Sequence, residues 1–288
     1  MRNTLKLMLA GLAALIMPAT LLTSTTAPAH ADVWGELRIV QANVGSSYGK
    51  TGDSWHVAMA VDNMQAQVVT MQEICESEFN RWHNEWGWWG VFTPMTDENE
   101  NSGTPGVSPG NACAGQRKGQ AILARPTVTV SNEQKMRLED ESSGGKEFWL
   151  TCVDISGITG GGTGKLKVCT THLSATDGAL RDRQLNQVKT WLHSFENDQN
   201  IAAVFTGDLN MTPEKAVLDS LYTRYKEVSH PDGRGEGQQP WTIWNSSANT
   251  TKKVDYIFAD RPNLFVEDSY WDNPLGDGHR IIRGTIRY

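Results

Sequence analysis

The feature of the sequence that most restricts its fold is a series of short strand-like runs with helical segments between only some of them. Eight runs are rich in apolar and β-branched residues: 36–42, 67–72, 119–123, 148–155, 166–171, 201–206, 254–258 and 280–288. Apolar residues also recur at helical spacing in three segments: 57–64, 79–86 and 185–195. Because strands and helices do not alternate strictly, the pattern favours an α/β sandwich over a barrel of repeated units.

Residues 1–31 have the composition of a secretory signal peptide. Arg2 and Lys6 provide a positively charged start, residues 7–17 form an apolar run, and residues 29–31, Ala-His-Ala, match the small-x-small cleavage pattern. The run is too short to span a hydrocarbon core of ~30 Å, although an uncleaved membrane anchor is the alternative interpretation. We therefore expect residues 1–31 to be removed, residues 32–288 to form a single domain, and the protein to be secreted to the extracellular space.

The chain is acidic, with a formal net charge of −7. A protein of this charge has no general electrostatic attraction for nucleic acid or for an anionic membrane. A phosphate-bearing substrate would therefore be held by a local site whose positive charge comes mainly from metal. This argues against a passive nucleic-acid binder more than against an enzyme, and we expect no stable membrane association.

The four cysteines predict two disulfide bonds, because exported proteins with an even number of cysteines usually pair them. Cys152 and Cys169 are nearly equidistant from the centre of the glycine-rich segment 156–164, which is typical of a hairpin turn, so they should face each other across two strands. This leaves Cys75 to pair with Cys113. Zinc binding is not expected, since the sequence has no Cys-x-x-Cys motif and no paired histidines.

Polar residues that suit metal or phosphate chemistry stand beside the ends of six strand-like runs. They are Asn43, Gln72 with Glu73, His172, Asp208 with Asn210, Asp255, and Asp277 with His279. Each has an ordinary explanation by itself, as a turn cap or a structural histidine. Together they predict that several strands bring carboxylates, amides and two histidines to one shared edge.

The segment 205–214, Phe-Thr-Gly-Asp-Leu-Asn-Met-Thr-Pro-Glu, shows how one strand could supply two of these groups. Side chains alternate along an extended backbone, so Asp208 and Asn210 should project in the same direction. A carboxylate beside a carboxamide suits a metal ion or a phosphate. Residues 212–214 then predict a helix start, with a capping hydroxyl, a proline at the first helical position and an acid near the positive end of the helix.

Four of these motifs resemble those of the endonuclease/exonuclease/phosphatase superfamily in their order and spacing, and within it the chain resembles a deoxyribonuclease-like, secreted bacterial-type member. They are Gln72-Glu73, Thr171-His172-Leu173, Gly207-Asp208-Leu209-Asn210 and Val254-Asp255-Tyr256. The resemblance extends from Asn43 to His279. It implies a four-layer α/β sandwich of two packed mixed β-sheets flanked by helices. It also implies one catalytic domain over residues 32–288 that hydrolyses a phosphoester with a divalent cation, Mg²⁺ or else Mn²⁺ or Ca²⁺.

The resemblance also implies the residues that hold the metal. Glu73 would ligate the ion with help from Asn43, and Asp277 would lie beside it. The family's final motif usually places Asp directly before His, whereas here Gly278 separates Asp277 from His279. On a strand this extra residue would turn both side chains to one face, but a glycine permits a bulge that would restore the geometry.

Five catalytic roles follow from the same resemblance. Asp208 would orient or deprotonate the attacking water, and Asn210 would hold a phosphate oxygen. His279 would lie against the scissile phosphate, with Asp255 fixing its tautomer. His172 would be the second histidine, donating to the phosphate or to the leaving oxygen.

Residues outside these motifs offer two further hypotheses about substrate binding. Arg117 and Lys118 are the best basic candidates for holding a substrate backbone, although exposed solubilising charge is an equal alternative. Tryptophans are concentrated at positions 82, 86, 88 and 89. Their spacing favours core packing over a platform that stacks on lipid or nucleic-acid bases.

The sequence therefore predicts a secreted, monomeric, metal-dependent phosphodiesterase that acts on nucleic acid, DNA or RNA. A first alternative keeps the chemistry and changes the substrate to a phospholipid such as sphingomyelin or to an inositol phosphate. A second alternative is a non-catalytic binding module whose site has decayed at Gly278.

Overall fold

A computed structural model describes residues 35–45, 51–95, 113, 116–141, 146–158, 164–199, 201–229, 242–245, 250–260, 265–275 and 278–288. The expected signal peptide and the expected metal ligand Asp277 lie outside these ranges. Within the ranges, no helix combines the length and the apolar character that crossing a membrane requires.

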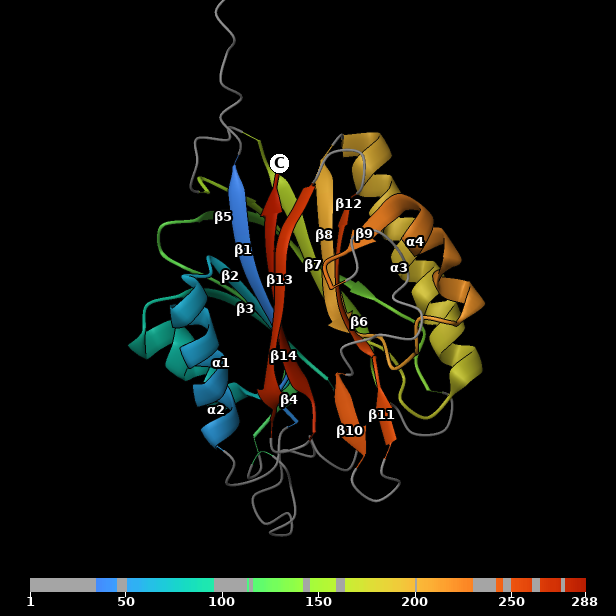
Figure 1. Cartoon of the computed structure of the whole chain (residues 1–288), viewed down its shortest axis with the longest axis horizontal. Helices are drawn as coiled ribbons and strands as arrows, with labels where there is room; N and C mark the ends of the chain where they lie inside the picture. The colour runs from blue at the N-terminus through green and yellow to red at the C-terminus, as the bar shows by residue number, and fades with distance from the viewer. Residues whose placement is uncertain are drawn as a thin grey trace, which may run out of the picture. The chain divides into compact units, whose positions relative to one another are not determined.

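In the described part of the chain, the first β-sheet contains six strands in the order β13-β14-β1-β2-β4-β3 (Figure 1). Its strands are β1 (Glu36–Asn43), β2 (Val68–Cys75), β3 (Trp89–Pro94), β4 (Lys118–Ala124), β13 (Phe265–Pro274) and β14 (Arg280–Arg287). Strands β1 and β2 are parallel, whereas the other neighbours are antiparallel. Because β1 and β2 are parallel, their C-terminal ends lie at the same edge of the sheet.

The second β-sheet, as far as the structure describes it, also has six strands, in the order β5-β6-β7-β8-β12-β9. They are β5 (Thr129–Arg137), β6 (Trp149–Ser156), β7 (Leu166–His172), β8 (Ala202–Asp208), β9 (Tyr225–Glu227) and β12 (Asp255–Asp260). Here β7 and β8 are the parallel pair. A short antiparallel pair, β10 (Ile243–Asn245) and β11 (Thr250–Lys252), forms a separate two-stranded sheet.

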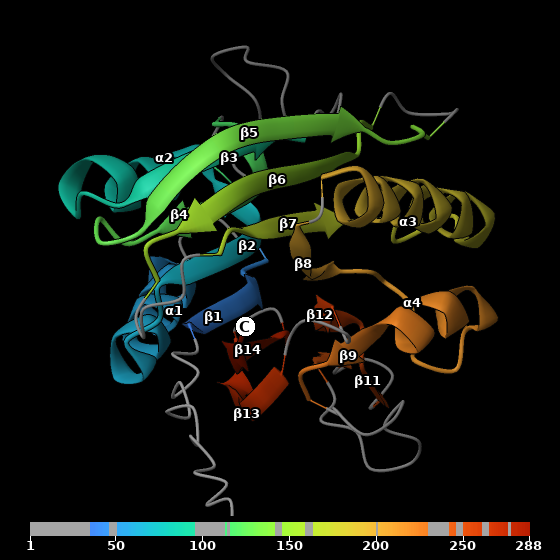
Figure 2. The same ribbon diagram turned by 90° about the horizontal axis from the view of Figure 1, so that it is seen from above.

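Helices cover the outer face of each sheet (Figure 2). On the first sheet these are α1 (Thr51–Met64), α2 (Glu76–Asn80) and the π-helical turn η1 (Arg81–Glu85). On the second sheet these are α3 (Gly178–Gln199), the 3₁₀ turn η2 (Ala216–Leu218) and α4 (Asp219–Arg224). The layers run helix, sheet, sheet, helix, which confirms the expected four-layer α/β sandwich.

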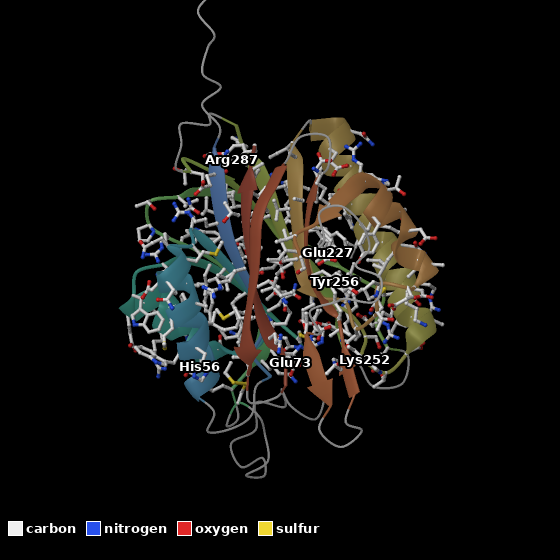
Figure 3. The ribbon with its side chains drawn as sticks, in the orientation of Figure 1. His56, Glu73, Glu227, Lys252, Tyr256 and Arg287 are labelled. Carbon is white, nitrogen blue, oxygen red and sulfur yellow. A yellow bond between two sulfur atoms is a disulfide. The ribbon has the colours of Figure 1, made fainter. Side chains whose placement is uncertain are left out.

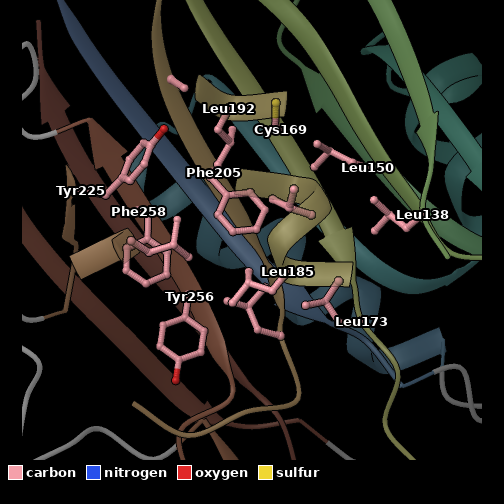
Figure 4. Packing of buried hydrophobic residues seen from close by; sticks show 14 of the residues in the cluster. Leu138, Leu150, Cys169, Leu173, Leu185, Leu192, Phe205, Tyr225, Tyr256 and Phe258 are labelled. Atoms are coloured by element: carbon pink, nitrogen blue, oxygen red, sulfur yellow. The ribbon is translucent and has the colours of Figure 1, made fainter. Parts of the chain in front are cut away.

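Three apolar clusters hold the four layers together. Ile39 and Val168 belong to the cluster between the two sheets. Trp82 belongs to the cluster under α1 and η1. Under α3, Leu185 packs with Phe205 and other side chains of the second sheet (Figure 4). Central strands are thus buried on both faces, which explains why the sequence shows them as nearly continuous apolar runs.

All eight strand-like runs of the sequence form strands, and the three helical segments correspond to α1, to α2 with η1, and to α3. The longer strands that the sequence did not indicate are β3, β5 and β13, and all three lie at the edge of a sheet. An edge strand such as β5 exposes most of its side chains, so it lacks the apolar pattern by which strands are recognised.

The helix start expected at residue 212 is wrong. The amide of Lys215 donates to the carbonyl of Thr212 at 3.1 Å, which closes a single turn, and regular helix begins only with α4 at Asp219. The helical residues begin where Leu218 and Leu221 can be buried against the second sheet. Apolar burial, rather than the capping signal, therefore decides where this helix starts.

Both expected disulfide bonds are present, Cys75–Cys113 and Cys152–Cys169. Cys152 lies directly opposite Cys169 in the antiparallel pairing of β6 and β7. Cys75 ends β2, so the Cys75–Cys113 bond fixes Cys113 to the edge of the first sheet at which β1 and β2 end.

We predict that replacing Cys152 and Cys169 together by alanine lowers the free energy of unfolding by about 3 kcal/mol, because the bond restricts the unfolded chain over a loop of 17 residues. Urea denaturation under non-reducing conditions measures the change. The wild-type protein with reductant serves as the control. Equal midpoints for the variant and the oxidised wild type would contradict the prediction.

Candidate active site

Three neighbouring strands of the second sheet, β7, β8 and β12, place a histidine and two aspartates side by side in one row. Asp208 at the end of β8 is the pairing partner of His172 on β7 and of Asp255 on β12. His172 Nε2 lies 3.6 Å from Asp208 Oδ2. All three residues are buried. The sheet register alone therefore brings together residues that are far apart in the sequence.

A glycine permits the close approach of β7 and β8 beside this row. Gly207 has a φ of +146°, and a Cβ atom at this position would lie 2.1 Å from the carbonyl oxygen of Thr171. Because that atom belongs to the backbone, no side-chain movement would relieve the contact. Only glycine fits here, which explains the glycine immediately before Asp208.

The first sheet contributes a carboxylate and an amide to the same edge. Asn43 ends β1, and its Nδ2 donates to Glu73 Oε1 at 3.3 Å and to Asp208 Oδ2 at 3.0 Å. Glu73 has a φ of +55°, and the pairing of β2 with β4 shifts register between Met71 and Ile74. This bulge redirects the glutamate side chain, a device common next to active sites. Glu73 lies at one end of the sheets and Arg287 at the other (Figure 3).

The two basic residues expected to bind substrate lie in different surroundings. Lys118 Nζ is 3.4 Å from Glu73 Oε2, so it belongs to the cluster. Burial opposes ionisation of Glu73, but His172, Lys118 and the Asn43 amide outweigh it and lower the pKa of this carboxyl to about 2. Arg117 instead pairs with Glu76 and lies over the ring of Phe92, with 5.9 Å between the guanidinium carbon and the ring centroid.

His279 joins the site directly after Gly278, whose backbone is hydrogen-bonded to Leu275. The amide of Gly278 donates to the carbonyl of Leu275, and Gly278 has a φ of +97°. His279 Nδ1 then lies 2.8 Å from Asp255 Oδ2, and its Nε2 lies 3.8 Å from Asp208 Oδ2. The glycine that departs from the family pattern thus occupies a backbone conformation that favours glycine, and the histidine next to it joins the cluster.

Burial controls the protonation of the central residues. Desolvation lowers the pKa of His172, although Asp208 and Glu73 oppose this shift. Desolvation raises the pKa of Asp208, and the neighbouring charge of Asp255 adds to it. A neutral imidazole therefore faces a carboxyl group that holds a proton more readily than an exposed aspartate does.

Asn210 does not project beside Asp208 as an extended strand would require. Strand β8 ends at Asp208, and Asn210 has a φ of +52°. Its backbone amide donates to Asp208 Oδ1 at 2.8 Å, while its side-chain amide donates to the carbonyl of Leu173 at 3.0 Å. Asn210 thus holds Asp208 and the end of β7 in place, a turn interaction typical of an aspartate–asparagine pair.

Sequence reasoning missed two residues that hold Asp255. Gln41 Nε2 donates to Asp255 Oδ1 at 3.2 Å, from β1 of the opposite sheet. Thr242 Oγ1 accepts from the backbone amide of Asp255 at 2.9 Å. Gln41 could have been noticed, because it is a polar residue inside an apolar run and shares a strand face with Asn43. No sequence signal distinguishes Thr242.

Hydrogen bonds between side chains join the two sheets near the site. Thr206 Oγ1 donates to Thr70 Oγ1 at 2.9 Å, and Gln72 Nε2 donates to Thr170 Oγ1 at 2.8 Å. Gln120 and Thr93 each contact Thr151 in the same way. The interior between the sheets therefore contains polar contacts with defined partners, and such contacts fix how the sheets are aligned.

The site has the donors that a hard divalent cation requires. Glu73 and Asp208 accept hydrogen bonds from one amide nitrogen, that of Asn43, although two carboxylates so close together repel each other. A cation between them would relieve the repulsion, and Asn43 would add its own oxygen if its amide turned. Asp208, Asp255 and His279 have ligand atoms within 4.8 Å of one another. This second set fits less well, because His279 and Asp255 already bind each other.

The chain belongs to the endonuclease/exonuclease/phosphatase family, whose family model matches residues 40–278. The matched region contains Asn43, Glu73, His172, Asp208 and Asp255. No curated protein sequence matches the chain significantly.

Solved structures share the fold at low sequence identity. The human Nocturnin catalytic domain with bound sulfate has a TM-score of 0.67 and 16% identity over 87% of this chain and 93% of that one. A Bacteroides thetaiotaomicron mannosyl-6-phosphatase has a TM-score of 0.63 and 12% identity over 88% and 100%. D. rerio TDP2 in complex with a single-strand DNA product has a TM-score of 0.61 and 16% identity over 87% and 98%. These similarities establish the architecture.

We predict that Gln41→Leu lowers the free energy of unfolding by about 1–3 kcal/mol, because it leaves a buried oxygen of Asp255 without this donor. His193→Ala is the control, since His193 is exposed on α3 and should leave the free energy of unfolding unchanged. Urea denaturation of both variants measures the difference. Equal free energies of unfolding for Gln41→Leu and His193→Ala would contradict the assignment.

Proposed function

We propose that this protein is a secreted phosphodiesterase that depends on a divalent metal ion and hydrolyses nucleic acid. The observation that carries the proposal is the convergence of Glu73, His172, Asp208 and His279 at one edge of the sandwich. His172 Nε2 lies 3.9 Å from Glu73 Oε1, and Asp208 Oδ2 lies within 4 Å of both histidines. Family membership supports the reaction class, and the composition of residues 1–31 supports secretion.

Glu73 and Asn43 would hold the metal ion, with Asp208 close enough to assist. When bound, the ion would supply positive charge for a phosphate oxygen and for the leaving group. Glu73 is suited to this role because its low pKa keeps it ionised at neutral pH. Lys118 adds a fixed positive charge beside Glu73 and would help to attract the anionic substrate. Whether Asp277 takes part stays a prediction, because it lies outside the described residues.

The remaining side chains would move protons and orient the phosphate. Asp208 would accept a proton from the attacking water, and its raised pKa makes it a better base than an exposed aspartate. Asp255 holds His279 through Nδ1, which leaves the Nε2 side of the ring directed toward Asp208 and the substrate. His172, buried and neutral, would donate from Nε2 to a phosphate or leaving-group oxygen.

A diester in nucleic acid is the substrate that we favour. The solved TDP2 complex holds single-strand DNA on a similar fold. A phosphomonoester is the second candidate substrate, because the mannosyl-6-phosphatase has a similar fold. A non-catalytic binding module with a site decayed at Gly278 is less well supported, because His279 next to this glycine is in hydrogen-bond contact with Asp255.

We predict that the purified protein hydrolyses bis(p-nitrophenyl) phosphate with Mg²⁺ or Mn²⁺ and loses this activity with a chelator. Asp208→Asn should lower kcat by about 10²–10⁴-fold, because the proton acceptor is lost. His193→Ala is the control, since His193 is exposed on α3 and should leave kcat unchanged. Full activity in chelator, or in Asp208→Asn, would show that the site is wrongly assigned.

We also predict that supercoiled plasmid DNA is nicked under the conditions that cleave the synthetic diester. Sugar phosphates, inositol phosphates and sphingomyelin are assayed in parallel by release of phosphate or phosphocholine. DNA or RNA cleavage at rates well above those for the other substrates is the expected result. Release of phosphate from a monoester, with nucleic acid left intact, would support phosphoester hydrolysis as the reaction but would contradict nucleic acid as the substrate.

A further inference from the structure

A hollow lined by indole rings lies on the outer face of the first sheet, between α1 and the segment that includes η1. Its volume is about 370 Å³. Seven residues line it: Trp55, Ala58, Val61 and Asp62 of α1, and Trp82, Trp86 and Trp88. We call it the indole pocket. None of its residues belongs to the candidate active site.

Large apolar side chains are exposed around this pocket. Among the described residues, four large hydrophobic side chains are exposed, and three of them lie on α1 or at the end of η1: Trp55 at 58%, Met59 at 47% and Trp86 at 38%. Apolar side chains that gather on a surface mark a site for a ligand or partner more often than scattered ones do. Trp82 and Trp88 are buried, as the sequence led us to expect, but Trp86 is not.

The angles between the rings favour a compact ligand. The ring of Trp82 is inclined at 64° to that of Trp86 and at 86° to that of Trp88, with centroids 4.8 and 5.1 Å apart. A nucleic-acid base or a sugar ring stacks on a flat, open face. Here the three rings pack edge to face directly against one another, so they offer no pair of parallel indole faces for a flat ring, and a small, rounded group fits the lining better.

The charge of the lining favours a cation. Asp62 is the only ionisable residue of the seven, and an indole face attracts positive charge. The guanidinium carbon of Arg125 already lies 5.1 Å from the ring centroid of Trp88, and Arg125 pairs with Asp62 Oδ1 at 3.0 Å. One of these indoles therefore already holds a cation, while Asp62 stays largely exposed at 73%.

A quaternary ammonium group matches this lining better than a primary ammonium group does. Its nitrogen has four carbon substituents and therefore no N–H group that needs a hydrogen-bond acceptor, and Ala58 and Val61 would contact its methyl groups. Indole faces replace its water shell at little desolvation cost, which is the basis of aromatic recognition of quaternary ammonium ligands. We propose that the indole pocket binds a quaternary ammonium group, either free as in choline or on a lipid headgroup.

Calorimetric titration of the full chain with choline tests the proposal. The neutral isostere 3,3-dimethylbutan-1-ol has the same shape without the charge. We expect choline to bind about tenfold more tightly than the isostere, because the cation–π and Asp62 contributions are lost in the neutral compound. Equal affinities, or no heat of binding with choline, would overturn the proposal.

Variants locate the binding site. Trp86→Ala and Trp55→Ala should each weaken choline binding about tenfold, and Asp62→Asn should weaken choline binding without affecting the isostere. Trp191→Ala is the matched control, because Trp191 is 41% exposed on α3, outside the pocket, and should bind choline as the wild type does. Wild-type affinity in Trp86→Ala would overturn the proposal. Unfolding midpoints confirm that the variants are folded.

A second measurement separates the two sources of the ligand. Co-sedimentation with phosphatidylcholine vesicles that is lost in Trp86→Ala identifies a lipid headgroup. Choline binding in solution without co-sedimentation identifies a soluble ligand. Because binding does not require phosphoester hydrolysis, this test is independent of the proposed activity.

Discussion

The close contact between β7 and β8 at Gly207 is the constraint on which the candidate site depends. The strands approach so closely that a side chain at this position would collide with the backbone of Thr171. This approach sets the separation of His172 and Asp208, and antiparallel pairing then adds Asp255 on the next strand. Any widening of the gap would separate the histidine from both acids. Backbone packing, rather than attraction among the polar side chains, therefore forms the row.

The second requirement is the alignment of the two sheets. Asn43 and Glu73 belong to one sheet, and His172, Asp208 and Asp255 belong to the other. Apolar packing alone tolerates small sliding movements, because it has little directional preference. The hydrogen bonds that Thr206 donates to Thr70 and that Gln41 donates to Asp255 have defined lengths and partners. They make one alignment of the sheets more favourable than its neighbours.

Much of this architecture could be predicted from the sequence because central strands are buried on both faces and show continuous apolar runs. Edge strands such as β5 could not, since their exposed faces carry ordinary polar residues. The disulfide between Cys152 and Cys169 could be predicted, because the two cysteines are nearly equidistant from the centre of the expected hairpin turn. The orientation of Asn210 could not be predicted, because the chain turns directly after Asp208.

The site residues were predictable in their identity but not in their relationships. The positions of Glu73, His172 and Asp208 beside the ends of strand-like runs identified them as candidates. The pairing of strands that makes them neighbours could be seen only in the structure. The role of Gln41 depends on a contact over 214 positions of sequence, which no local pattern reveals. Lys118 and Arg117 are adjacent in the sequence, yet they pair with different acids: Lys118, the first residue of β4, contacts Glu73, whereas Arg117, which precedes the strand, pairs with Glu76.

The division of the site between two sheets has a consequence for when the protein can act. Each half of the sandwich carries an incomplete set of chemical groups, so neither half could perform the proposed hydrolysis by itself. A nascent or partly unfolded chain would be inert toward phosphoesters, and competence would arise only when the halves dock. Activity would therefore require both sheets to be present in their native alignment.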